Sequence, residues 1–363
     1  MGKQVNHGLL RIARQHKGVS QGEAARGLGI PQVTLSRYEN GVTHPGEEFI
    51  GKASILYDLP DSFFYQPDVV FGAPVSVHPM WRKKHDVTGR EMDIIVAELN
   101  LRTIHIRRLL QAVEHAPKRD IPKLDLDEYE GDIERIASLV RAHWLLPAGP
   151  LGNLTAALEI AGCIVVHSDM QGSAISGVTV SVAGVPPMIL LNRDQPADRM
   201  RYTLAHELGH MVLHRFPGPN MEREANEFAS ALLMPAKDIK GALSGRIDLR
   251  RLAALKPEWR VSMQGLLYRA QALEIINKGE ATWLWRQFSS LRMKLREPPE
   301  LDFPMEQPSV LPKMVRLHLD AFGYSQGELA RLFHIHPHTL SDLYSPEKIS
   351  DAASRAGRLR LVQ

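Results

Sequence analysis

Hydrophobic positions recur at helical spacing along most of the chain. Between residues 92 and 113 apolar side chains lie three, four or seven positions apart, which places them on one helix face. Similar patterns predict helices over residues 133–144, 154–161, 263–276 and 281–295. Three short apolar runs, at 163–166, 176–183 and 187–191, are typical of buried strands. The pattern predicts a mostly helical α+β protein with a small mixed sheet.

The first 68 residues have the pattern of a separate all-helical domain. Ser20 precedes an apolar run and Glu23 follows three positions later, which is typical of a capping box at a helix start. The predicted helices are separated by tight turns, as in a helix-turn-helix domain. They cover Leu9–Gln15, Gln21–Leu28 and Pro31–Glu39.

Two proline-containing segments and an internal repeat divide the rest of the chain, residues 69–363. A proline-containing linker is predicted over 69–90, then a domain over 91–300 with its core at 150–240. A second proline-rich linker opens the segment 301–363, which is predicted to be helical. In this segment, ten of the twenty residues from Ser325 onward equal those from Ser20 onward, so a second helix-turn-helix-like unit is expected. Asp342 replaces Arg37 there, which favours packing or protein interaction over DNA contact.

Composition adds limits on location and partners. The net charge of +3 gives no strongly basic field, and the single cysteine, Cys163, excludes a disulfide framework. The sequence has no signal peptide and no apolar run near membrane-spanning length. We therefore expect a cytoplasmic protein with no membrane partner.

The segment His206-Glu207-Leu208-Gly209-His210 carries the candidate chemistry. Histidines four positions apart lie on the same side of a helix, where both can bind one Zn²⁺ ion. Glu207 is close enough to take a proton from water at that ion. A catalytic zinc site needs a third protein ligand and a position for water. The alternative is a pair of helix-surface histidines that bind no metal.

The next predicted helix, 221–235, offers glutamates. Glu222 lies at the edge of its apolar stripe, one turn before Asn226, whereas Glu224 and Glu227 point elsewhere and are expected to be solvated. His214, one turn beyond the histidine pair, is the rival for the third ligand position.

The combined motif is similar to a known family. HELGH, a short turn and E-x-x-A-N-x-F-A-x-x-L-L-M-P resemble the ImmA/IrrE family of zincin-like metallopeptidases. The resemblance implies that His206, His210 and Glu222 bind Zn²⁺ and that Glu207 is the catalytic base. Asn226 is a candidate for orienting one of the ligands.

The N-terminal domain resembles the phage-repressor-like (XRE or Cro/cI type) DNA-binding domains. The resemblance rests on Ser20-Gln21 and on the run from Thr34 to Gly41. In such domains the second helix enters the major groove. The resemblance implies that bases are contacted by Gln32, Val33, Thr34 and Arg37, and phosphates by Gln21 and Asn40. A helical protein-interaction module is the alternative.

Together these resemblances predict a zinc-dependent endopeptidase joined to a DNA-binding domain. The expected substrate is a transcriptional repressor, cleaved under stress or on induction of a mobile element. One alternative is a DNA-binding regulator whose zinc site is structural or inactive. Another is an antitoxin-like protein that binds DNA and a neighbouring protein. The sequence leaves a homodimer open.

Overall fold

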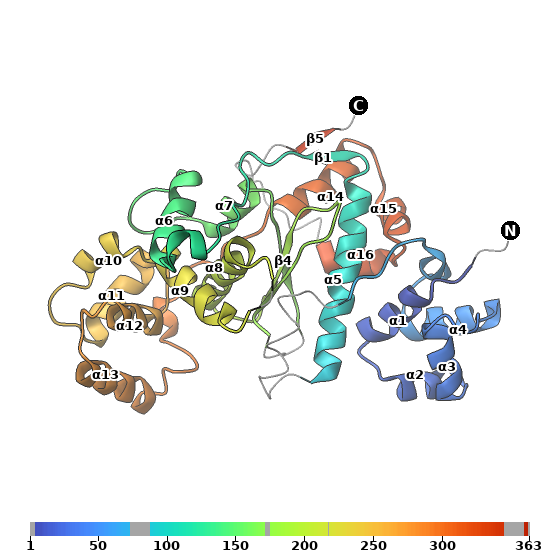
Figure 1. Cartoon of the computed structure of the whole chain (residues 1–363). Coiled ribbons are helices and arrows are strands. Elements are labelled where there is room, and N and C mark those ends of the chain that lie inside the picture. Colours follow the sequence, from blue (N-terminus) through green and yellow to red (C-terminus); the bar gives the residue numbers. More distant parts are fainter. Residues whose placement is uncertain (1–3, 73–87, 171–174, 217, 345–358, 362–363) are drawn as a thin grey trace.

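The N-terminal domain consists of helices, as predicted. The computed structural model describes residues 4–72, 88–170, 175–216, 218–344 and 359–361. At one end of the molecule (Figure 1) lie α1 (His7–His16), α2 (Gln21–Leu28), α3 (Gln32–Glu39), α4 (Glu47–Tyr57) and the 3-10 helix η1 (Asp61–Tyr65). The capping box of Ser20 and Glu23 is confirmed. Helix α3 begins one residue later than predicted, because Pro31 has an extended backbone and occupies the N-cap position.

A long central helix, α5 (Gly89–Leu109), lies between this domain and the middle of the molecule (Figure 1). The prediction extended this helix to Val113, but Val113 instead begins the short strand β1 (Val113–His115). Strand β1 pairs antiparallel with β5 (Leu359–Leu361) close to the C-terminus. Most of the linker predicted over 69–90 lies outside the described residues.

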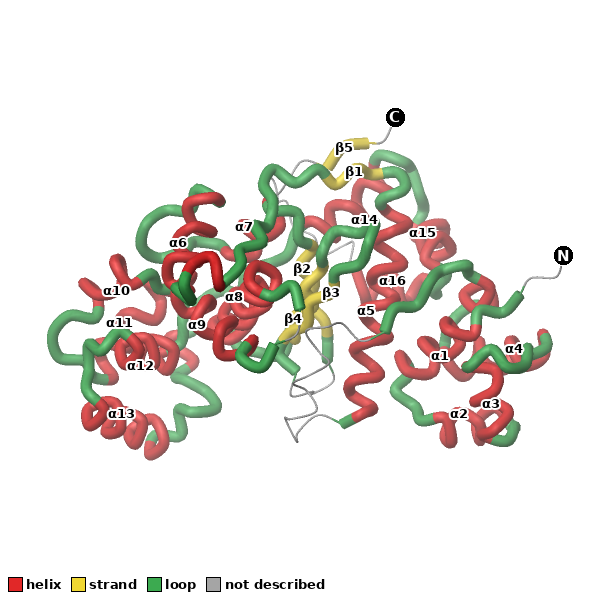
Figure 2. Tube along the Cα trace, in the orientation of Figure 1, coloured by secondary structure: helices red, strands yellow, loops and turns green. Residues whose placement is uncertain are grey.

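The predicted mixed sheet is confirmed and has three strands, visible in Figure 2. They are β2 (Ile164–Ser168), β3 (Gly177–Val180) and β4 (Met188–Asn192). Their order is β2-β4-β3, with β4 parallel to β2 and antiparallel to β3. Strand β3 is therefore an edge strand of the sheet as the described residues form it.

The two faces of this sheet belong to different hydrophobic cores. Ile164 and Leu190 join the cluster that contains the N-terminal domain and α5, whereas Val165 and Ile189 join the other cluster. This alternation follows from the two-residue period of a strand. Helix α14 (Val310–Asp320) packs on the first side, and α7 (Leu154–Ile160) and α8 (Ala197–Leu213) pack on the second.

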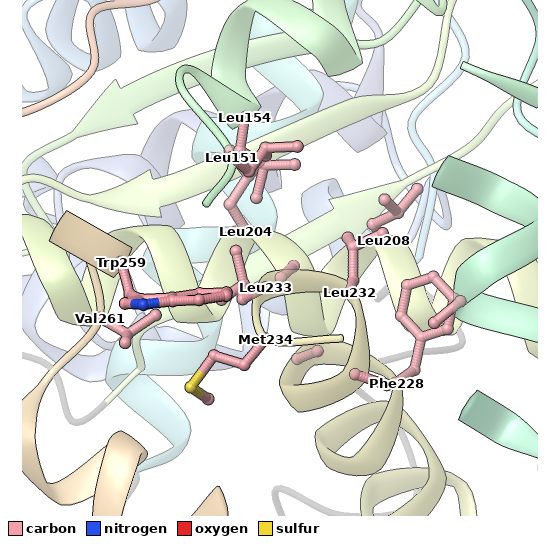
Figure 3. Packing of buried hydrophobic residues seen from close by; sticks show 14 of the residues in the cluster. Leu151, Leu154, Leu204, Leu208, Phe228, Leu232, Leu233, Met234, Trp259 and Val261 are labelled. Atoms are coloured by element: carbon pink, nitrogen blue, oxygen red, sulfur yellow. The ribbon is translucent and has the colours of Figure 1, made fainter. Parts of the chain in front are cut away.

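The second core is built mainly from helices around α8. The close view in Figure 3 shows side chains of α8 and α9 (Met221–Leu233) packed together near Trp259. Trp283 of the neighbouring helix is about half exposed (49%). The other elements here are η2 (Asp127–Tyr129), α6 (Ile133–His143), α10 (Ala236–Ala242), α11 (Leu249–Trp259), α12 (Met263–Ala272) and α13 (Lys278–Ser290).

The segment predicted as a second linker lies against the central domain. After the 3-10 helix η3 (Pro299–Leu301), Glu306 pairs with buried Arg201, and Ser309 donates hydrogen bonds to Glu159. The repeat then forms α15 (Gln326–Phe333) and α16 (Pro337–Tyr344), and α15 packs against α5. Within the described residues, none of the helices is both long and apolar enough to span a bilayer.

Candidate metal centre

Helix α8 carries the histidine pair and is fixed by burial of its opposite side. Its apolar stripe is buried, with Leu204 and Leu208 almost inaccessible to solvent. Pro196 occupies the N-cap position of α8, and Asp198 lies inside the first turn. The Asp198 carboxylate accepts a 2.7 Å hydrogen bond from buried Lys256. This ion pair connects the start of α8 to α11.

Gly209 allows α9 to approach α8 closely. A Cβ atom at this position would lie 3.1 Å from the Cα of Ala225 and 3.1 Å from a ring carbon of Phe228. Such contacts are tight, so a larger residue would force the helices apart. The close approach brings the first turn of α9, with Glu222, beside the histidines of α8.

Three side chains converge between the two helices. The Nε2 atoms of His206 and His210 are 3.0 Å apart, and His210 Nε2 is 3.0 Å from Glu222 Oε1. The distance from His206 Nε2 to the second Glu222 oxygen is 3.5 Å. His210 is buried, and the other two side chains are partly accessible. Among the described residues, these three form the group of possible metal ligands.

The spacing of these atoms fits a small cation. Two donors that each lie about 2.0–2.1 Å from a tetrahedral zinc ion are roughly 3.3–3.4 Å apart. The observed separations of 3.0, 3.0 and 3.5 Å bracket that value. Three protein donors also leave one tetrahedral position for water or substrate. The residues therefore suit a His₂Glu site.

Glu222 contributes a negative charge to the cluster. Desolvation raises the pKa of the Glu222 carboxyl, but the hydrogen bonds and charges of His206 and His210 outweigh it and lower the pKa well below the usual value. Glu222 is therefore ionised at neutral pH. Its carboxylate gives the site negative charge.

Glu207 is held by the sheet. It is buried, and the hydroxyl of Thr179 on β3 donates a 2.6 Å hydrogen bond to its Oε2. Strand β3 approaches α8 closely because Gly177 has no side chain. A Cβ atom there would lie 2.6 Å from a methyl carbon of Thr203. Glycine on the strand thus brings Thr179 within reach of Glu207.

Asn226 lies behind His206. Its Oδ1 is 3.2 Å from His206 Nδ1, and its Nδ2 donates to the Glu222 carbonyl oxygen at 2.7 Å. Burial raises the pKa of Tyr202 to about 12, so its hydroxyl remains protonated and donates to the Asn226 carbonyl at 3.1 Å. These contacts orient Asn226 so that its side-chain oxygen faces the ring. The ring can then carry its proton on Nδ1 and direct the Nε2 lone pair into the cluster.

The residues expected to read DNA bases lie on α3. Gln32, Val33 and Arg37 are exposed, whereas Thr34 is half-buried. Buried Leu35 on the opposite side fixes α3 to the domain. The exposed side chains therefore form one outward-facing surface on the second helix of the pair.

The two expected phosphate contacts differ in their surroundings. The Gln21 amide donates a 2.8 Å hydrogen bond to Glu39, which also binds Arg14 through both carboxylate oxygens. Gln21 thus belongs to a network within the domain. Asn40 is exposed, and its amide donates to the Ser36 carbonyl at 2.8 Å.

Comparison with protein families gives two matches. Residues 158–271 match the peptidase M78 family model, described as the IrrE N-terminal-like domain. Residues 10–64 match a helix-turn-helix family model. The chain joins a helix-turn-helix domain to an IrrE N-terminal-like domain. The resemblance inferred from the sequence is thereby confirmed. No curated protein matches the chain.

Within the IrrE N-terminal-like domain, His214 lies outside the ligand cluster. Its Nδ1 is 3.0 Å from His210 Nδ1, on the side of that ring away from Glu222. Its Nε2 is 3.1 Å from Glu224 Oε2. Glu224 was expected to be solvated, but its side chain is only 14% exposed, because it packs beside His214.

Several residues that shape the site carried no separate prediction. Gly209 and Gly177 set the distances between elements, and Thr179 contacts Glu207 from a strand 28 positions earlier. A glycine between the two histidines was the one local signal. Such a glycine indicates a close approach of two helices only when the helix that faces it is known.

Proposed function

We propose that this chain is a zinc-dependent endopeptidase whose helix-turn-helix domain binds DNA. The observation that carries the proposal is the convergence of His206, His210 and Glu222 on one point, with Glu207 next to it in the sequence. The match to a peptidase family supports the same conclusion. We assign Zn²⁺ because two imidazoles and one carboxylate are an established catalytic zinc set.

The side chains have separate roles in peptide hydrolysis. A bound Zn²⁺ ion would lower the pKa of water and polarise the scissile carbonyl. Glu207 accepts the proton of the attacking water and later delivers it to the leaving amine. Thr179 holds one oxygen of that carboxylate, so the other oxygen is the one that exchanges the proton. Asn226 keeps the His206 ring in position.

Strand β3 is the proposed support for the substrate backbone. It stands at one end of the sheet order and carries Thr179, the partner of Glu207. An extended peptide that adds to a sheet end is held through main-chain hydrogen bonds, with little dependence on side chains. A peptide in this position would pass close to the metal ligands.

The proposed substrate is a transcriptional repressor. The helix-turn-helix domain would bring the peptidase to DNA, and two proteins on neighbouring sites meet at a high effective concentration. Cleavage of the repressor would release stress or mobile-element genes, as the family resemblance implies. For base contact on that DNA we propose Gln32, Val33, Thr34 and Arg37, and for phosphate contact Gln21 and Asn40.

The substitution Glu207→Gln tests the enzymatic role. It preserves side-chain size and the hydrogen-bond acceptor for Thr179 but removes the base, a change worth roughly 10²–10⁴-fold in rate. We expect the full-length variant to bind Zn²⁺ and DNA as the wild type does. In induced cells it should fail to cleave a tagged repressor encoded by the neighbouring gene, as followed by immunoblot.

Glu227→Gln serves as the matched control, because Glu227 is exposed and pairs with Arg223. This variant should cleave the repressor normally. If wild type and Glu207→Gln give equal repressor levels and equal transcription, the peptidase role is wrong. A DNA-binding regulator or antitoxin-like protein with a structural zinc site would then replace it.

A further inference from the structure

A chain of polar side chains extends from His210 away from the metal cluster. His214, at the C-cap of α8, lies between His210 and Glu224. The two contacts measure 3.0 Å between the Nδ1 atoms and 3.1 Å from His214 Nε2 to Glu224 Oε2. The side chains of His214 and Glu224 are 7% and 14% exposed. This arrangement of His210, His214 and Glu224 shares only His210 with the group of three ligands.

The donors and acceptors allow one consistent placement of protons. His210 Nε2 faces Glu222 and His206, so a metal ligand there needs its lone pair on Nε2 and its proton on Nδ1. The Nδ1–H group then donates to Nδ1 of His214. His214 in turn carries its proton on Nε2 and donates it to the Glu224 carboxylate, which only accepts.

We propose that His214 and Glu224 are positioning residues that hold His210 in its metal-binding tautomer and orientation. The inference rests on the proposed metal site and deepens it. A histidine ligand commonly donates its second ring N–H to a carboxylate, carbonyl or water, and this partner raises the basicity of the ligand. Here the carboxylate acts through an intervening imidazole.

The surroundings of Glu224 distinguish it from the neighbouring glutamate on α9. Glu227 is 42% exposed and pairs with Arg223 at 2.8 Å, as surface charges commonly do. Glu224 is largely buried and lies toward His214, with Arg223 at 3.7 Å from its other oxygen. Burial of a carboxylate costs free energy unless hydrogen bonds compensate. The His214 N–H provides that compensation. It also sets the donor-to-acceptor direction of the hydrogen bonds that run from His210 through His214 to Glu224.

The two ligand histidines are therefore supported differently. His206 donates to the neutral amide of Asn226, whereas His210 donates to an imidazole backed by a carboxylate. Loss of the Glu224 charge should weaken metal binding through His210 alone. It should leave the His206–Asn226 contact unchanged.

The test measures Zn²⁺ affinity of the full-length protein by competition with a chromophoric chelator. We expect Glu224→Ala and His214→Ala to lose about 10- to 100-fold in affinity, the range for residues that orient metal ligands. Glu224→Gln keeps an acceptor for His214 and should recover part of the loss. Glu227→Ala is the matched control and should bind Zn²⁺ as the wild type does.

A second readout separates positioning from general loss of structure. The Co²⁺-loaded Glu224→Ala protein should show a shifted visible absorption spectrum, because the orientation of His210 changes. Thermal unfolding of the metal-free proteins should be the same for Glu224→Gln and Glu227→Ala. Wild-type affinity in all His214 and Glu224 variants would overturn the inference.

Two further variants keep this outcome distinct from failure of the metal site. If His206→Ala and Glu222→Ala lose Zn²⁺ while the Glu224 and His214 variants retain it, the site stands and the positioning role is wrong. If the wild type itself binds no Zn²⁺, both the proposed function and this inference are wrong.

Discussion

The two helix-turn-helix units share their start and turn but differ in what their second helices face. Ser20 and Ser325 each begin the first helix with a capping box. Each first helix ends at a residue in the left-handed region, Gly29 with φ 69° and His334 with φ 54°. The local signals are thus nearly the same in both copies, and the differences lie in a few side chains.

In the N-terminal copy the second helix is fixed from inside its own domain. Glu39, near the end of α3, is buried and paired with Arg14 of α1 at 2.6 Å. The outward side of α3 keeps Val33 and Arg37 exposed. This copy presents a free surface that suits the major groove.

In the C-terminal copy the equivalent of Glu39 is Tyr344, and it faces α5. Its buried ring lies under the Arg102 guanidinium, 4.7 Å from the ring centre, and its hydroxyl is 2.7 Å from His105 Nδ1. Arg102 also donates to the Leu343 carbonyl. The end of α16 is therefore docked on the central helix.

The start of α16 faces the N-terminal domain. His338, the equivalent of Val33, lies 3.2 Å from the Asp58 carboxylate, and His334 lies 2.9 Å from the Ser62 hydroxyl. A position that faces solvent in one copy thus contacts a neighbouring domain in the other. The shared backbone thus supports an outward-facing second helix in one copy and a docked second helix in the other. The side chains at equivalent positions decide which of the two forms.

The largest expected effect comes from Arg102→Ala, which would undock the C-terminal copy. Buried Glu98 binds Arg102 at 2.8 Å, and removal of one partner of a buried ion pair costs about 3–5 kcal/mol. We expect the backbone amides of α15 and α16 to lose hydrogen-exchange protection, while those of α2 and α3 retain it.

Lys52→Ala is the control for Arg102→Ala. Lys52 pairs with Glu48 at the same four-residue spacing, but both side chains are exposed, so exchange should not change measurably. If α15 and α16 keep full protection in Arg102→Ala, the contacts of Arg102 with Tyr344 and Leu343 do not dock the C-terminal copy.

An intermediate effect is expected from Arg37→Ala. One bidentate base contact is worth roughly 1–3 kcal/mol, so affinity for a selected duplex should fall while non-specific binding remains. The measurement is a salt-dependent titration of the full-length protein with the selected and a scrambled duplex.

Asp342→Ala changes the equivalent position of the C-terminal copy and should leave DNA affinity unaltered. If it raises or lowers affinity as much as Arg37→Ala does, both copies contact DNA. The functional difference between the two units would then disappear.

The same contrast separates what the sequence can predict from what it cannot. The capping box of Ser20 and Glu23 and the three short strands depend on residues a few positions apart, and the structure confirms them. The docking of Tyr344 on Arg102 joins residues more than 240 positions apart, and no local pattern indicates it. Within the repeat, the visible signs are Asp342 in place of Arg37 and Tyr344 in place of Glu39.

The metal centre follows the same rule. The four-residue spacing placed His206 and His210 on one side of a helix, and that placement needed no tertiary information. The burial of Glu224, in contrast, could be known only from the tertiary structure. Helical periodicity indicates which way a side chain points, but burial depends on the neighbouring helix, here through His214.

The smallest expected effect is that of His338→Ala, which tests whether the start of α16 contributes to docking. The His338 side chain is 60% exposed and its partner Asp58 is 53% exposed, so solvent screens their interaction. Exposed pairs of this kind contribute at most about 1 kcal/mol. We expect hydrogen exchange in α16 to accelerate by no more than roughly fivefold, against a much larger change in Arg102→Ala. Val33→Ala, at the equivalent position, should leave exchange in α3 unchanged because Val33 is 64% exposed. An effect of His338→Ala as large as that of Arg102→Ala would move the main docking contact from α5 to the N-terminal domain.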